Sequence, residues 1–155
     1  MTGPGVFDPA DIGAVLFACS MNQVRSPMAA ALLRRRWGGR IFVDSCGLRA
    51  GVGVDPFVEA VMDEMGLDLH GHRPKTFDDL EDGSFDLVIS LSPEAQHRAV
   101  ELSRGRAVEL AYWPTIDPTV VDGSREQRLD AYRRVRDELD KRIGERFPRP
   151  STFGG

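Results

Sequence analysis

Two residues of this chain, Cys19 and Arg25, have types and a spacing that predict chemistry. An apolar run, residues 14–18, comes directly before the cysteine, and Ser26, Pro27 and an alanine- and leucine-rich run follow the arginine. This order is typical of a buried strand, a tight loop and a helix that begins near a proline. Such a loop can turn successive backbone N–H groups over a helix N-terminus, which makes a site for a tetrahedral oxyanion.

Each residue type in the loop suits one part of phosphoryl chemistry. Helix N-termini and nearby cations lower a cysteine pKa from ~8.5 into the range of ~3.5–7.5, so we expect Cys19 to be a thiolate nucleophile. Arg25 can hold two phosphoryl oxygens in a planar geometry that lysine lacks. Ser26 is expected at the helix N-cap, with its hydroxyl donating to the sulfur. The other predicted phosphate-binding positions are Ser20, Met21, Asn22, Gln23 and Val24.

The two cysteines have different expected roles. An isolated buried cysteine is by default a small core residue, but the Cys-x5-Arg-Ser-Pro context favours catalysis for Cys19. Cys46 ends a second expected strand, and we expect it only to pack in the core.

The N-terminal pattern, together with an Asp-Pro pair at Asp117-Pro118, resembles the low-molecular-weight protein tyrosine phosphatase family and the related thioredoxin-coupled arsenate reductases. The resemblance runs from about Ala14 to Phe147. It implies a cysteinyl-phosphate intermediate on Cys19, phosphate binding by Arg25, and Asp117 as general acid and then base, with no metal and no cofactor. Asn22 matches a family asparagine that holds the loop in shape, and asparagine tolerates positive φ.

The loop departs from the commoner family pattern at two positions. Met21 stands where glycine is usual and is expected to reshape the rim. Val24 stands where a second cysteine is frequent, so the usual protective intraloop disulfide cannot form and we expect sensitivity to peroxide.

Substrate choice is less constrained by the sequence. Thr119 and Val120 follow the Asp-Pro pair where phosphotyrosine-specific relatives have aromatic residues. Tyrosine specificity therefore needs aromatic contacts from elsewhere. The aromatic residues available for this are Trp113, Tyr112 and Phe57.

Two alternatives to hydrolysis of a phosphomonoester stay open. Residues 115–118 and 132–138 look closer to the arsenate reductase branch, which uses two further cysteines. No cysteine follows Cys46, and Ser92 lies about where one is expected, so arsenate reduction needs an external thiol. The second alternative is a non-catalytic module that binds phosphate or a phosphoprotein.

The expected elements form an α/β fold. Short apolar strands are predicted at residues 14–19, 41–46, 86–91 and 107–111, alternating with helices, as in a parallel sheet. The start signals of the helices are Ser26-Pro27, Asp55-Pro56, Ser92-Pro93 and a capping box at Ser124. We predict a three-layer fold with a four-stranded parallel sheet, order 2-1-3-4 as the resemblance implies, helices on both faces, and the site at the end of the first strand.

Composition limits the classes of protein and partner. The 155 residues, 41% apolar, fit a single domain at 13–148, with a loosely ordered extension at 1–12 and a flexible tail at 149–155. A net charge of −4 favours neither nucleic acid nor an anionic membrane as partner. We expect a monomer or weak dimer that acts on a phosphorylated protein or small phosphoester. The absence of a signal-like segment and the two cysteines favour the cytoplasm.

The histidines show no metal-ligand spacing. His70 and His72 are predicted to lie in turns and His97 on a helix surface, so a metal site is not expected.

Overall fold

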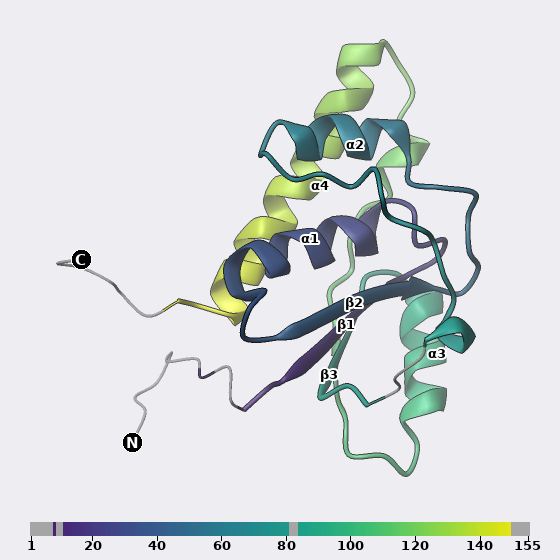
Figure 1. Ribbon diagram of the computed structural model, residues 1–155. Coiled ribbons are helices and arrows are strands. Elements are labelled where there is room, and N and C mark those ends of the chain that lie inside the picture. Colours follow the sequence, from purple (N-terminus) through teal and green to yellow (C-terminus); the bar gives the residue numbers. More distant parts are fainter. Residues whose placement is uncertain (1–7, 9–10, 81–83, 150–155) are drawn as a thin grey trace, which may run out of the picture.

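A four-stranded parallel sheet organises the chain. The computed structural model describes residue 8, residues 11–80 and residues 84–149 (Figure 1). The strands, in sheet order β2-β1-β3-β4, are β1 (Ala14–Cys19), β2 (Phe42–Gly47), β3 (Leu87–Ser90) and β4 (Glu109–Tyr112). The predicted order is confirmed, with the ends of β2, β3 and β4 displaced by one or two residues. Sequence order reverses around β1, so a ligand crevice is expected beyond the carboxyl end of this strand.

The helices begin at their capping residues with one exception. They are α1 (Arg25–Trp37), α2 (Pro56–Asp63), α3 (Pro93–Ser103) and α4 (Arg125–Arg146), with short 3-10 turns η1 (Phe77–Asp79) and η2 (Pro118–Val120). Asp55, Ser92 and Ser124 cap α2, α3 and α4 as predicted. The N-cap role predicted for Ser26 is wrong: Val24 is the N-cap of α1, without a side-chain bond, so Ser26 lies inside the first turn.

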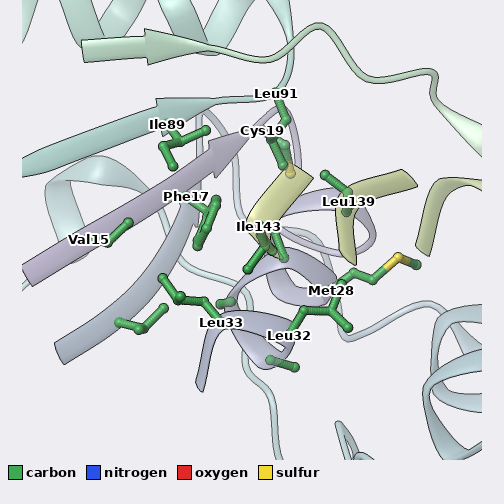
Figure 2. Close-up of a cluster of buried hydrophobic side chains, with 14 of the residues drawn as sticks. Val15, Phe17, Cys19, Met28, Leu32, Leu33, Ile89, Leu91, Leu139 and Ile143 are labelled. Carbon is green, nitrogen blue, oxygen red and sulfur yellow. The ribbon is translucent and has the colours of Figure 1, made fainter. Parts of the chain in front are cut away.

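Two core clusters lie on opposite faces of the sheet. Val15, Phe17 and Cys19 of β1 enter one cluster with α1 and α4, while Leu16 and Ala18 enter the other with α3. α2 packs on α4 (Figure 1). The apolar stripe of α4 is buried throughout: Leu129, Tyr132, Val135, Leu139 and Ile143. Figure 2 shows Cys19 at one end of the first cluster, close to Leu91.

The structure describes a few residues of the two predicted terminal segments, 1–12 and 149–155. Ile12 is buried in the first cluster, and the guanidinium of Arg149 donates to the carbonyl oxygens of Arg35 and Arg36. The rest of the predicted N-terminal extension, apart from residues 8 and 11, and residues 150–155 lie outside the described residues. In the described ranges, no helix combines the length and apolar character needed to cross a membrane.

Candidate active site

Residues 20–26, called the 20–26 loop, comprise the connection from β1 to α1 and the first two residues of α1. The peptide carbonyls of the connection point outward. All four carbonyl oxygens from residue 20 to residue 23 accept hydrogen bonds from surrounding segments. The donors are the N–H groups of Leu48 and Arg49 to Ser20 (2.9 and 3.0 Å), Gly51 to Met21 (3.1 Å) and Asp55 to Gln23 (3.3 Å), and the Nε2 of His72 to Asn22 (2.9 Å). The loop is therefore held from outside by the segment after β2 and by His72.

The N–H groups of this loop consequently face the other side. A trans peptide places its C=O and the following N–H in opposite directions, and none of the described peptides is cis. The outward carbonyls of residues 20–23 thus turn the N–H groups of residues 21–24 inward. In the described part of the chain, no N–H from residue 21 to residue 25 donates to a protein group. These donors form a concave nest of the kind that binds an oxyanion at a helix N-terminus.

Asn22 holds the turn of the loop, as predicted. Its φ of 55° is the only positive value among described residues other than glycine. The buried side chain amide donates to Ser26 Oγ (2.9 Å) and Ser45 Oγ (3.0 Å), and its oxygen accepts the N–H of Lys75 (2.9 Å). Three segments thus meet on one amide group, which compensates for the left-handed backbone that the loop requires.

Cys19 lies at the base of the loop with a hydroxyl beside its sulfur. The Sγ of Cys19 is 2.9 Å from Ser26 Oγ, and the thiol side chain is buried. Because Ser26 Oγ also accepts from Asn22, its own proton is directed either to the sulfur or to the carbonyl oxygen of Cys46, 3.2 Å away. The predicted contact between Ser26 and the sulfur therefore exists, although it comes from the first helical turn and not from a cap.

Arg25 connects the loop to the segment that carries Asp117. Its Nη1 donates to the carbonyl oxygen of Thr115 (3.0 Å), and the residue is only 9% exposed. It forms no ion pair with any carboxylate of the described residues. A buried guanidinium without a counter-ion favours an anion, since burying an unpaired charge is costly.

Asp117 is half-buried beside this arginine-bound segment. Its Oδ1 accepts from the N–H (3.0 Å) and Oγ1 (2.7 Å) of Thr119, which fixes the carboxylate at the start of η2. The pKa of Tyr132 is raised mainly by burial, then by its hydrogen bond to Asp55, and Asp117 adds to the shift. The turn η2, which Asp117 caps, packs against α4, the helix that carries Tyr132.

Sequence reasoning missed His72. Predicted as a turn residue, it lies half-buried in the loop after α2 with its ring against the 20–26 loop. A carbonyl oxygen can only accept, so Nε2 carries the proton in the contact with Asn22. Burial lowers the pKa of His72, and the charge of Lys75 acts in the same direction. No local pattern signals this role, since the two residues are 50 positions apart.

Cys46 packs in the core, as predicted. It enters the α3-side cluster, whereas Cys19 enters the α1-side cluster. Both thiols are unbridged. Burial raises the pKa of Cys46, and the nearby Cys19 raises it further, so Cys46 remains a neutral thiol.

Ser92, which lies about where a cysteine is expected from the resemblance to arsenate reductases, is the N-cap residue of α3. Its hydroxyl caps α3 and accepts from Ser20 Oγ at 3.2 Å. A hydroxyl at this position cannot take part in thiol–disulfide exchange.

The aromatic residues are divided between the core and the site. Trp113 is buried against Phe17, with ring centroids 6.2 Å apart, and does not supply an exposed wall. Phe57 is half-buried against Tyr132 (5.2 Å), next to Asp55 and hence near the loop. Of the three aromatic residues considered, Phe57 therefore has the contacts closest to the site.

His70 lies in a cluster of acidic residues that the spacing of the histidines in the sequence does not indicate. His70 contacts Glu59. One ring nitrogen of His70 and one carboxylate oxygen each of Asp63 and Asp68 also lie within 4.8 Å of one another. All three members of that group are exposed. The cluster belongs to α2 and the following turn, and none of its members contacts the 20–26 loop. His97 lies exposed on α3, as predicted.

The sequence is similar to those of known proteins over most of its length. The family model for low molecular weight phosphotyrosine protein phosphatase matches residues 14–148. The chain belongs to this family. An arsenate reductase of Halalkalibacterium halodurans is 32% identical over 83% of the chain and 91% of that protein. A glutaredoxin arsenate reductase of Synechocystis is also 32% identical, over 83% of the chain and 92% of that protein.

The fold is also similar to that of a solved structure. It is described as an arsenate reductase in the phosphate binding state, with 28% identity and a TM-score of 0.65. The match covers 84% of this chain and 93% of that one. The family model is thus named for a phosphotyrosine protein phosphatase, while the similar proteins above are named for arsenate reduction.

Proposed function

We propose that the chain is a phosphomonoester hydrolase of the protein tyrosine phosphatase type, working through a cysteinyl-phosphate intermediate. One observation carries the proposal: the nest of inward N–H groups, the unpaired buried Arg25 and the sulfur of Cys19 meet at one strand end. The nest and the guanidinium suit a dianionic phosphoryl group. The sulfur supplies a nucleophile.

The reaction has two steps. Cys19 attacks phosphorus in line, forming the S–P bond while the P–O bond to the leaving group breaks and Asp117 protonates the departing oxygen. Water then attacks phosphorus, Asp117 takes its proton, and the sulfur leaves. Arg25 and the amides stabilise the charge on the equatorial oxygens in both steps. Ser26, donating to the sulfur, stabilises the departing thiolate.

Hydrolysis of a phenyl phosphate ester tests the proposal. We expect turnover by the native protein, none by Cys19→Ser, and a reduction of kcat by ~10²–10³-fold for Asp117→Asn, because proton transfer of this kind contributes ~10²–10⁴-fold. The reduction should be smaller for an ester whose leaving group needs no proton.

Two matched variants control this experiment. Asp122→Asn removes an exposed carboxylate from the same segment, and Cys46→Ala removes the other thiol. Both should retain near-native kcat. An inactive native protein that binds phosphate tightly, with Cys19→Ser binding it equally well, would instead support the non-catalytic module.

Arsenate reduction with an external thiol is the second candidate, because the similar relatives include proteins named arsenate reductase and glutaredoxin arsenate reductase. Arsenate would condense with Cys19 with loss of water. A donor thiol would then attack the sulfur, forming a mixed disulfide as arsenite leaves with the electron pair, and a second thiol would regenerate Cys19. Arsenite formation with glutathione and glutaredoxin, measured beside phosphatase turnover, separates the two candidates.

A further inference from the structure

Two arginines at the start of α4 have no carboxylate partner. Arg125 is exposed and Arg128 is half-buried, and neither pairs with a carboxylate of the described residues. Another arginine of the same helix, Arg133, is paired instead. Arg133 bonds to Glu64, Glu126 and Asp130.

The two arginines are held over an aromatic ring. The guanidinium carbons of Arg128 and Arg125 lie 4.5 and 5.6 Å from the centroid of Phe57. A ring face orders a guanidinium while leaving its N–H groups available. The pair is therefore positioned without being neutralised.

This platform of Arg125, Arg128 and Phe57 adjoins the active site. The N–H of Phe57 donates to Asp55, and the N–H of Asp55 donates to Gln23 of the 20–26 loop. On the other side, Phe57 packs on Tyr132, on which the charges of both Arg128 and Asp117 act. Because α4 also packs against η2, which Asp117 caps, the platform is connected both to the loop that would hold phosphate and to the segment of the proposed general acid.

Local electrostatics do not explain two cations at this position. A helix N-terminus carries partial positive charge, so arginines in the first turns are unfavourable there. Of the nearby carboxylates, Asp55 accepts from Phe57 N–H and the Tyr132 hydroxyl, and Asp117 accepts from Thr119; among the described residues neither forms an ion pair with Arg125 or Arg128. Cations in such a place favour an anion that comes from outside the chain.

We propose that Arg125 and Arg128 form a subsite for acidic residues that flank the phosphorylated residue of a peptide or protein substrate. This inference rests on the proposed hydrolase function and adds a substrate class to it. The phosphoryl group occupies the nest at Cys19, and a neighbouring Asp or Glu side chain of the substrate binds the guanidinium groups above Phe57 as a charge-assisted pair.

Hydrolysis of matched phosphotyrosine peptides tests the subsite. We expect the native protein to favour a peptide with flanking glutamates over one with flanking glutamines by roughly three- to ten-fold in kcat/KM, the size that two exposed ion pairs give. The preference should disappear in Arg125→Gln/Arg128→Gln and at high salt, which screens exposed charges. Arg125→Glu/Arg128→Glu should favour a peptide with flanking lysines.

Arg134→Gln is the matched control, because Arg134 is an exposed arginine of the same helix without a carboxylate partner among the described residues. It should keep the native preference. Equal rates on acidic and neutral peptides in the native protein, or an equal loss on both in the double variant, would overturn the subsite alone. Failure to hydrolyse any peptide and a phenyl phosphate ester would overturn the proposed function.

Discussion

At the scale of single residues, the site depends on a few atoms with assigned partners. Asn22 adopts positive φ and bonds to Ser26, Ser45 and Lys75, while Ser26 lies 2.9 Å from the sulfur of Cys19. The sequence predicted the first and last of these roles because the loop pattern is contiguous. It could not predict the contacts of Ser45 and His72, because only the folded chain brings these distant residues to the loop.

Peroxide should inactivate the protein through Cys19 without forming an internal disulfide. The loop has Val24 where the resemblance leads us to expect a second cysteine, and Cys46 lies in the other core cluster. We expect sulfinic acid on Cys19 by mass spectrometry and no recovery with thiol reductant. Phosphate should protect. In Val24→Cys, activity should recover on reduction. A Cys19–Cys46 disulfide in oxidised native protein would contradict this expectation.

At the scale of elements, the segment after β2 determines the shape of the loop. Its N–H groups bind three of the outward carbonyls, and Gln23 Nε2 returns a bond to the carbonyl of Gly53 (2.8 Å). Strand β1 was predicted at its observed bounds because an apolar run ends at the motif. The start of α1 was not, because the loop winds directly into the helix at Val24 and leaves no separate capping residue.

Gly47→Ala tests the close approach of these two segments. A Cβ at Gly47 would lie 2.7 Å from the backbone N of Asn22 and 2.9 Å from the carbonyl oxygens of Ser20 and Arg49. Backbone on both sides cannot move as a side chain can. We expect the free energy of unfolding to fall by ~1–3 kcal/mol and phosphatase activity to fall with it.

Urea unfolding and phenyl phosphate hydrolysis provide the two measurements. Gly53→Ala is the control, because its Cβ would meet no atom within 4 Å. It should change neither quantity appreciably. Native-like stability and activity in Gly47→Ala would show that the loop does not need this approach.

At the scale of the whole molecule, the sheet places residues from three regions at the carboxyl ends of its strands. The end of β1 provides Cys19, and the segment after β4 provides Asp117. The segment after β2 provides the N–H groups that hold the 20–26 loop. The sheet order was predicted because it follows from the resemblance. The burial of Trp113, one of three aromatic residues considered for contact with a substrate ring, was not, because it results from packing on Phe17. Long-range packing of this kind has no local sequence signal.

Protonation of His72 should lower the stability of the whole fold. Because burial lowers its pKa in the folded chain, the unfolded chain, with a pKa of about 6.5, takes up the proton first. The contribution of neutral His72 to the free energy of unfolding is therefore fully present above pH 6.5. It is lost as the pH falls through the pKa that His72 has in the folded chain.

Urea unfolding across this pH range measures the effect. The free energy of unfolding should decline less steeply below pH 6.5 in His72→Gln than in the native protein. His97→Gln, which alters an exposed histidine on α3, should leave the native slope unchanged. A native slope in His72→Gln would show that this histidine does not couple folding to pH.

Acid-quenched turnover with a phosphate-labelled substrate tests the central claim most directly. The proposed route requires phosphorus to bond to the sulfur of Cys19, so labelled phosphate should be trapped on the peptide that contains this residue. The trapped fraction should rise in Asp117→Asn with a substrate that needs no acid, because the second step lacks its base. Turnover that proceeds without label on that peptide, or at the native rate in Cys19→Ser, would contradict the account.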